Sequence, residues 1–141
     1  MLIGEYSHNL DTKGRVSIPS KFRDDLGGTF VLAKGVNDCL AAYSKNEWEH
    51  FQEELLALKG ADGRRLRRFF FSGATECEID AQGRILIPPI LRTYANLSRE
   101  VTIAGVSDHM EIWNKEDWDK YMNAQAMSPK EVEDAMERLG L

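Results

Sequence analysis

Two stretches of the chain show the same alternation of hydrophobic and polar positions around a short polar connection. In the first, Tyr6, His8 and Leu10 share one parity before the connection, and Val16 and Ile18 share it afterwards. The second stretch has the same spacing, at Thr75, Cys77, Ile79, Ile85 and Ile87. A period of two predicts β-strands, because successive side chains of a strand point to opposite faces. Each connection is therefore predicted to be a turn between two strands.

The same series of elements is predicted after each strand pair. A short helix follows Pro19 and ends before Gly27-Gly28, and its counterpart begins with Pro89 in a first-turn position. Two strands and a longer helix come next, and Ser44 and Asn114 stand at the N-cap positions of those helices, three residues before an acid. The predicted elements are short helices at 20–26 and 89–97 and strands near 29–34, 39–43, 100–104 and 109–113.

The spacing of apolar residues also predicts the remaining helices. The helix after Ser44 carries an apolar stripe. The residues of that stripe are Trp48, Phe51, Leu55 and Leu58. A connector at 59–63 leads to a predicted helix that contains the basic run Arg64–Arg68 and ends in Phe69–Phe71. The second copy of the pattern opens there. Ser128 and Pro129 begin a final amphipathic helix with a capping box.

The chain is an internal duplication. Residues 4–23 align with residues 73–92 at a constant shift of 69 positions, and after one extra residue the shift becomes 70. Identical pairs include Gly4/Gly73, Asp11/Asp80, Gly14/Gly83, Arg15/Arg84, Ile18/Ile87, Pro19/Pro88, Arg23/Arg92, Lys45/Lys115 and Trp48/Trp118. Two copies predict a pseudo-twofold pair rather than a solenoid, which requires at least three repeats. The predicted division is 1–60 for the first repeat with its trailing helix, and 61–141 for a connector helix, the second repeat and the C-terminal helices.

A five-residue phrase, Asp-x-x-Gly-Arg, occupies the predicted turn of each copy. Glycine enters the left-handed backbone region without steric cost, so it suits the pivot of a tight turn. An aspartate three residues earlier can cap such a turn through its side-chain oxygens, and is predicted to orient it. The arginines leave the two turns in matching positions. The members of the phrase are Asp11, Gly14 and Arg15 in the first copy and Asp80, Gly83 and Arg84 in the second.

The net charge of −5 over 141 residues is unevenly distributed along the chain. Residues 1–23 carry four Lys or Arg against two acids, and residues 61–99 carry seven against four. Both of these positive segments contain the repeated phrase. The segments 24–60 and 100–141 are acidic, with three bases against seven acids and four against ten. Because local charge determines whether a phosphate backbone is attracted, the overall acidity does not exclude a nucleic-acid partner.

A cytoplasmic protein without cofactor or catalytic site is expected. Met1–Glu5 lacks the features of a signal peptide, and no apolar run approaches the roughly 20 residues of a membrane span. Cys39 and Cys77 have no CxxC spacing, which is typical of reduced thiols. His8 matches Cys77 in the repeat and Cys39 matches His109, but no paired-ligand spacing accompanies them, so no metal site is predicted. No GxSxG, Walker A or HExxH phrase is present, which argues against an enzyme.

The doubled phrase, with the proline that closes each following strand, resembles the MraZ family, bacterial proteins with two SpoVT/AbrB-type domains in one chain. The matching residues are Asp11–Pro19 and Asp80–Pro88, together with Trp48, Trp118 and Phe69–Phe71. The resemblance covers the chain to about Tyr121. It implies a mainly β fold with α content (α+β), a double-split β-barrel of the AbrB/MazE/MraZ type formed by swapped hairpins of two pseudo-symmetric halves, plus flanking helices.

The resemblance also implies a function. The signature arginines of the family, here Arg15 and Arg84, are expected to contact double-stranded DNA, with Lys13 beside the first. Gln82 stands where the first turn has Lys13, so the second turn is expected to be electrostatically weaker. The implied role is sequence-specific transcription regulation upstream of the division and cell-wall gene cluster, at the nucleoid. A homo-oligomer, expected to be a ring, would bind repeated operator boxes.

Several alternatives remain open. The Asp–Arg pairs could merely tie each turn together, since exposed pairs stabilise by only about 0–1 kcal/mol. The Arg64–Arg68 run could extend a phosphate footprint, or form an ordinary solvated helix face that pairs with an acidic helix of a neighbouring subunit. Trp48 and Trp118 are expected to pack in the core or between subunits. The barrel could also serve as an antitoxin-like or scaffold module that binds protein and not DNA.

Overall fold

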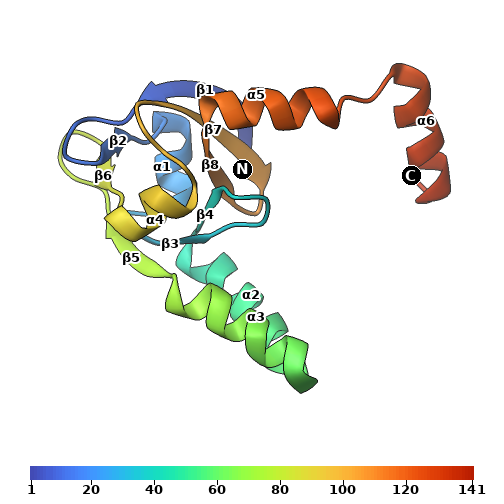
Figure 1. The fold of residues 1–141 in the computed structure, drawn as a ribbon, viewed down its shortest axis with the longest axis horizontal. Helices are drawn as coiled ribbons and strands as arrows, with labels where there is room; N and C mark the ends of the chain where they lie inside the picture. Colours follow the sequence, from blue (N-terminus) through green and yellow to red (C-terminus); the bar gives the residue numbers. More distant parts are fainter.

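A computed structural model describes residues 1–141 as an α+β fold with six helices and antiparallel strand pairing (Figure 1). The strands are β1 (Leu2–Asn9), β2 (Arg15–Ser17), β3 (Thr29–Lys34), β4 (Leu40–Tyr43), β5 (Thr75–Glu78), β6 (Arg84–Leu86), β7 (Glu100–Ser107) and β8 (Met110–Asn114). The helices are α1 (Ser20–Leu26), α2 (Lys45–Ala57), α3 (Gly60–Ser72), α4 (Pro89–Tyr94), α5 (Lys115–Ala124) and α6 (Pro129–Arg138). The predicted mixture of β and α structure is confirmed.

One six-stranded antiparallel sheet joins the two repeats, in the order β1-β7-β8-β4-β3-β5. In the repeat alignment β1 matches β5, β7 matches β3 and β8 matches β4, so the strand order reads the same from either end. The first strand of each repeat pairs with a strand of the other repeat, β1 with β7 and β5 with β3. The two repeats are therefore interleaved, with β4 and β8 paired at the centre of the sheet.

Strands β2 and β6 form a separate two-stranded antiparallel ribbon. Backbone hydrogen bonds extend it at both ends: the Ile18 N–H donates to the Gly83 carbonyl at 2.9 Å, and the Ile87 N–H donates to the Gly14 carbonyl at 2.8 Å. The hydrogen-bond ladders of the ribbon and of the six-stranded sheet do not join into one closed barrel. The predicted double-split barrel is therefore not confirmed at that level of detail.

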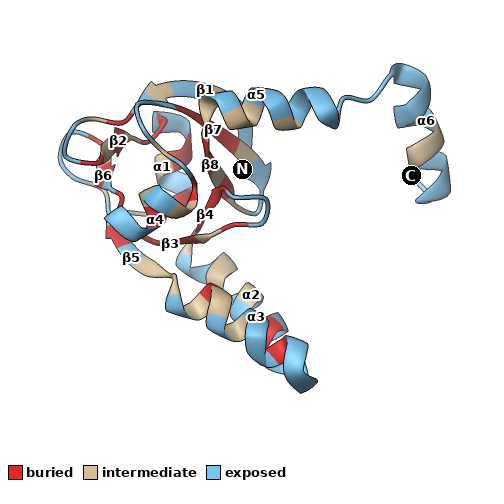
Figure 2. Cartoon of the chain, viewed as in Figure 1, coloured by how far each residue is buried: buried red, intermediate tan, exposed pale blue.

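A single hydrophobic core draws on both repeats. Its 19 buried residues come from the sheet, the ribbon, the short helices α1 and α4, and the connections next to them. Figure 2 shows the buried positions concentrated in these elements, whereas the longer helices are mostly exposed. The repeat partners Phe22 and Leu91 are both buried in this core, as are Ile18 and Ile87. Because each repeat completes the core of the other, the ribbon is positioned by both.

Two boundaries differ from the predicted ones. Helix α4 ends before residue 97, because Asn96 adopts a φ of 54° and the Leu97 N–H donates back to the Arg92 carbonyl at 2.9 Å. Asparagine in the left-handed conformation ends helices as glycine does. Helix α3 starts at Gly60, inside the predicted connector, and continues through Phe69–Phe71 to Ser72, and the first strand of the second repeat begins at Thr75.

Helices α2, α5 and α6 begin at their predicted caps. The Ser44 Oγ accepts the Glu47 N–H at 3.2 Å, the Asn114 Oδ1 accepts the Asp117 N–H at 2.9 Å, and Ser128 completes a capping box. Helices α2 and α3 form a hairpin that projects from the sheet, and α6 lies apart beyond α5 (Figure 1). None of the helices combines the length and the apolar character required to span a bilayer.

Candidate nucleic-acid interface

The first repeated turn is held by the side chain of its aspartate. Oδ1 of Asp11 accepts the backbone N–H groups of Lys13 at 2.9 Å and Arg15 at 2.8 Å. Oδ2 of Asp11 accepts the Nε–H of Arg15 at 2.8 Å. The Gly14 N–H donates to the Asp11 carbonyl at 3.0 Å, and Gly14 has a φ of 85°. This pattern is that of a tight turn followed by a left-handed residue, a position that favours glycine.

The second turn repeats this geometry bond for bond. Oδ1 of Asp80 accepts the backbone N–H groups of Gln82 and Arg84, both at 2.9 Å, and Oδ2 accepts the Arg84 Nε–H at 3.0 Å. Gly83 has a φ of 80°. In one further contact, Nη2 of Arg84 donates to the Gln82 Oε1 at 3.4 Å. Lys13, the counterpart of Gln82, has no acceptor on its side chain and cannot make that contact.

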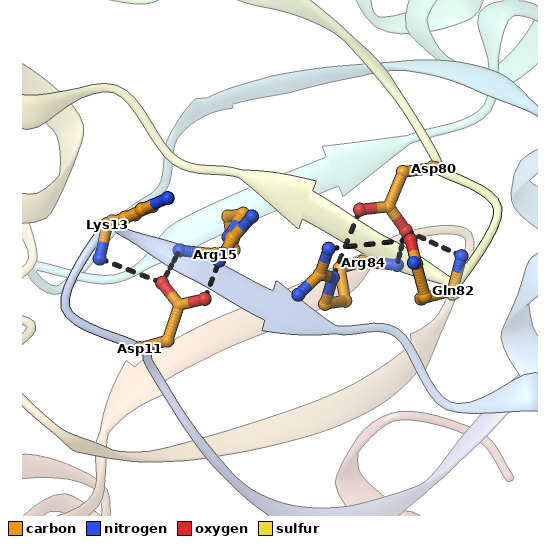
Figure 3. A network of polar contacts seen from close by, with 6 residues as sticks. All are labelled: Asp11, Lys13, Arg15, Asp80, Gln82 and Arg84. Atoms are coloured by element: carbon orange, nitrogen blue, oxygen red, sulfur yellow. Dashed lines mark hydrogen bonds and ion pairs between the residues drawn. The ribbon is translucent and has the colours of Figure 1, made fainter.

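Arg15 and Arg84 lie on the same outward face of the β2–β6 ribbon. The register places Arg15 opposite Leu86, two positions from Arg84 on the facing strand. Side chains alternate along a strand, so the intervening pair, Val16 and Ile85, faces inward, and each is 1% exposed. Figure 3 shows the two turns at opposite ends of the ribbon, with both guanidinium groups between them. The structure thus brings the two predicted cations onto one surface.

Each aspartate engages the guanidinium group only through Nε, so apart from the weak contact of the Arg84 Nη2 with Gln82 the Nη groups are left to an external ligand. The side chains of Arg15 and Arg84 are 32% and 29% exposed. A guanidinium held along one edge keeps a fixed orientation, and its remaining N–H groups match a phosphate or a guanine edge in bidentate geometry. The exposed Lys13 adds a mobile positive charge beside Arg15.

Both aspartates remain ionised at neutral pH. The pKa of Asp11 is lowered chiefly by the backbone N–H of Arg15, with a further contribution from the guanidinium of the same residue. The Arg84 backbone and side chain lower the pKa of Asp80 in the same way. A lowered folded-state pKa means that the Asp–Arg contacts are fully present above the ordinary value of 3.8 and are lost only as the pH falls below it.

Two further arginines, which sequence reasoning did not assign to the site, lie against the turns. Arg92 of α4 covers Gly14, where an added β-carbon would stand 2.8 Å from the Arg92 Cζ. Arg23 of α1 covers Gly83, where an added β-carbon would overlap the guanidinium. Each turn is therefore covered by an arginine of the opposite repeat. The only signal in the sequence is that Arg23 and Arg92 are the one identical pair in two otherwise different helices.

The two covering arginines are not equivalent. The Nε of Arg23 donates to the Ile18 carbonyl at 3.0 Å, whereas the Nε of Arg92 is buried without a hydrogen-bond partner. An unpaired buried donor costs about 1–3 kcal/mol. A groove of about 510 Å³ beside the first turn is lined by Arg92, Asp11 and Asn96, among others. The first turn is thus covered by the arginine that is less firmly held.

The histidines and cysteines singled out in the sequence have other roles. No group of three or more His, Cys, Asp or Glu side chains is placed to hold a metal ion. Instead, His109 lies between two carboxylates, with Nδ1 2.7 Å from Asp108 and Nε2 3.0 Å from Glu111. Burial lowers the pKa of His109, but the hydrogen bonds to Glu111 and Asp108 outweigh it, and the net shift is upward. Burial raises the pKa of the Cys39 thiol to about 12, so it stays protonated.

The raised pKa of His109 predicts a pH-dependent contribution to stability. A group whose pKa is higher in the folded state stabilises the fold fully below its unfolded pKa, here 6.5, and loses that contribution as the pH rises through the folded value. We expect the free energy of unfolding of the parent protein to fall relative to that of His109→Gln by about 1 kcal/mol between pH 6 and pH 9, the scale of one partly buried charged hydrogen bond.

Urea denaturation at several pH values measures this difference. His50→Gln is the matched control, because the His50 side chain is exposed. The pKa of His8 is lowered, first by burial and then by Arg23, so His8 contributes in the opposite sense and cancels in the comparison of parent and variant. Parallel pH profiles for the parent and His109→Gln would contradict the prediction.

The fold and the site together define a class of duplicated α+β proteins in which two interleaved repeats expose a pair of aspartate-held arginines on one ribbon. The sequence model of one family matches the chain twice, over residues 1–69 and 70–139, and is described as "MraZ protein, putative antitoxin-like". The chain belongs to the MraZ family.

Relatives that align with most or all of the chain carry the name of this family. The chain is 52% identical to "Transcriptional regulator MraZ" of Caldicellulosiruptor saccharolyticus and 48% identical to that of Alkaliphilus metalliredigens, and both alignments cover 100% of each chain. It is also 52% identical to the protein of that name from Desulforamulus reducens, over 89% of each chain. Membership of this family makes the chain a transcriptional regulator and not an enzyme.

Proposed function

We propose that the protein regulates transcription by binding double-stranded DNA sequence-specifically through its two turns. It acts upstream of the division and cell-wall gene cluster, in the cytoplasm at the nucleoid, and binds repeated operator boxes as a homo-oligomer that forms a ring. The relatives named as transcriptional regulators support the coarse role. The more specific statements, on how the protein binds DNA, are argued from the β2–β6 ribbon.

The placement of Arg15 and Arg84 on one exposed face of the ribbon carries the proposal. A two-stranded antiparallel ribbon fits the major groove of B-form DNA. Arginine binds the O6 and N7 atoms of guanine with two parallel hydrogen bonds, and the Nη groups of Arg15 and Arg84, which the aspartates do not engage, are available for such a contact. The aspartates act as positioning residues, since they fix both guanidinium groups before DNA arrives.

The small number of cations on one protomer supports binding by an assembly. Lys13 and the two arginines supply only a few phosphate or base contacts, and the net charge of −5 is unfavourable at long range. Several protomers that engage successive boxes convert later contacts into intramolecular ones, which raises the overall affinity by orders of magnitude. Repeated boxes and a multi-copy regulator are therefore expected together.

The proposal includes a double-split barrel as the support of the ribbon. Val16 and Ile85 pack their inward faces into the same core as the six-stranded sheet. The Leu10 N–H donates to the Arg99 carbonyl at 2.7 Å, and the Ile79 N–H donates to the Gly28 carbonyl at 3.0 Å, so both connections into the ribbon are tied to the opposite repeat. A ribbon held in this way is rigid enough to present arginines at a fixed spacing.

Titration with DNA tests the function. Duplexes selected from a random pool by the protein are compared with scrambled duplexes of the same length over a series of salt concentrations. We expect the selected duplex to bind more tightly at every salt concentration, with the logarithm of the binding constant falling linearly with the logarithm of salt. Equal binding of selected and scrambled duplexes would overturn sequence specificity.

The description of the family as antitoxin-like favours one alternative function, a module that binds a protein partner. An interaction module of that kind predicts no salt-dependent binding to either duplex. It also predicts that a protein, and not DNA, is retained by the immobilised chain. The salt series therefore separates the two functions in one experiment.

A gain of charge in the second turn provides a further prediction. Gln82→Lys gives the second turn the cation that Lys13 gives the first, and removes the weak contact to Arg84. One additional phosphate contact per protomer is expected to steepen the slope of log K against log salt by about 0.9 per engaged protomer. Lys13→Gln is the reciprocal variant and is expected to flatten it. An unchanged slope in both variants would show that position 82 and its counterpart lie away from the DNA.

A further inference from the structure

An open groove lies along α3, away from the arginine-bearing turns. It has a volume of about 740 Å³ and apolar and basic walls. Its lining residues are Asp62, Arg65, Leu66, Arg68, Phe69 and Ser72. The arginines of the Arg64–Arg68 run therefore have different surroundings. Arg65 and Arg68 border this groove. Arg67 instead donates to the Leu58 carbonyl at 2.7 Å and holds the end of α2.

Helix α6 carries an apolar face that nothing in the chain covers. Four apolar residues recur at intervals of three and four and so share one side of the helix. These residues are Val132, Ala135, Met136 and Leu139. Val132, Met136 and Leu139 are all more than 40% exposed, and α6 has no buried residue. A helix of this length is marginal in water without a surface to pack on, even with its complete capping box.

The groove and α6 have complementary charges. Helix α3 carries four arginines against one aspartate, a net charge of +3, and α6 carries four acids against two bases, a net charge of −2. On α6, Glu133 borders the apolar face and Glu137 lies one turn further along, toward the polar side. In the groove, Arg65 and Arg68 lie with Leu66 and Phe69. An apolar stripe with acids on one side thus matches an apolar floor that carries arginines.

The α6 of the same chain lies away from this groove. Figure 1 shows the α2–α3 hairpin and α6 projecting from different parts of the molecule, with the whole of α5 leading away from the hairpin. The segment between Ala124 and Ser128 has only three residues, a reach of about 10 Å when fully extended. The two surfaces do not meet within one chain, and both are left free to meet between two copies of it.

We propose that α6 of one copy docks in the α3 groove of the next copy. The contact joins two different surfaces, so it is head-to-tail, and repetition gives a ring where the rotation closes. It rests on the assembly included in the proposed function and identifies the surfaces that form it. It also assigns Arg65 and Arg68 to subunit contact and not to DNA, which leaves the ribbon turns free.

Charge reversal tests the contact. One variant carries Arg65→Glu with Arg68→Glu, a second carries Glu133→Lys with Glu137→Lys, and a third carries all four changes. Glu49→Lys with Glu53→Lys on exposed positions of α2 is the matched control, with the same charges and the same spacing as the α6 pair. The mass in solution is measured by light scattering at micromolar concentration and low salt. Binding to a duplex with a single box is measured in parallel.

The proposal expects the first and second variants to fall from the mass of the parent assembly toward that of one chain, while the control keeps the parent mass. Mixing the two variants in equal amounts is expected to restore the assembly, because each then meets an oppositely charged partner. The variant with all four changes is expected to assemble by itself.

Parent-like mass in both reversed variants, or a mixture that does not reassemble, would overturn the contact. A parent that stays monomeric would overturn it as well. Specific binding to the single-box duplex reports on the proposed function separately, since it depends on the ribbon: if that binding persists while the charge reversals leave the mass unchanged, only the docking proposal fails.

Discussion

The double variant Arg15→Ala with Arg84→Ala is expected to lose specific DNA binding while it remains folded. Each arginine that reads a guanine contributes about 1–3 kcal/mol of discrimination, so loss of both weakens binding to a single box by about 30-fold or more. The effect multiplies when several protomers engage successive boxes. The fold is expected to survive, because partly exposed Asp–Arg pairs stabilise by only about 0–1 kcal/mol.

Two controls sharpen this test. Arg15→Lys with Arg84→Lys keeps both charges but removes the bidentate geometry, so it should retain the salt dependence and lose the preference for the selected duplex. Arg64→Ala removes an exposed arginine outside the groove and the ribbon, and should bind like the parent. Parent-like affinity of the double alanine variant, still folded and assembled, would remove the ribbon from the DNA interface.

The local structure could be predicted from the sequence because its signals are local. The helix that follows Ser44 starts where its cap predicts, and helix α1 ends at Gly27, which has a φ of 85°. The repeated turns have the geometry that glycine and aspartate impose on short loops. Asn96 was missed as a helix end, because asparagine takes the left-handed conformation less often than glycine does.

The pairing of the strands could not be predicted from the periodicity. A period of two shows which side chains share a face, but not which strand lies alongside. A turn between β1 and β2 suggests that the two strands pair with each other, yet β1 pairs with β7 and β2 pairs with β6. The exchange lets both repeats bury their apolar faces in one core.

The contact of Arg23 and Arg92 with the turns follows from that exchange. Neither arginine is near the turn that it covers in the sequence, and each lies on a helix of the opposite repeat. The duplication marked them as identical without indicating a role. Only the interleaved arrangement turns that identity into a contact between the repeats.

Replacement of glycines that have a positive φ is expected to destabilise the protein in a graded series, smallest at Gly60, which begins α3, and larger at the two turn glycines. Gly60→Ala introduces only the strain of a positive φ, about 1–2 kcal/mol, because nothing lies within 4 Å of the added β-carbon. Gly14→Ala adds displacement of Arg92, whose Nε has no hydrogen bond to lose. Gly83→Ala adds displacement of Arg23, which costs its hydrogen bond to Ile18 and brings the loss to about 3 kcal/mol or more.

The free energy of unfolding of each variant is measured by urea denaturation. Gly28→Ala is the control, because Gly28 has neither a positive φ nor a neighbour within 4 Å of an added β-carbon. A double-mutant cycle of Gly83→Ala and Arg23→Ala isolates the contact between the repeats: the combined loss should be smaller than the sum of the single losses, because Arg23 can be displaced only once. Strict additivity, or equal losses for Gly83→Ala and Gly60→Ala, would show that the arginine only lies beside the turn. Coupling would instead show that each DNA-facing loop is held in place by the repeat to which it does not belong.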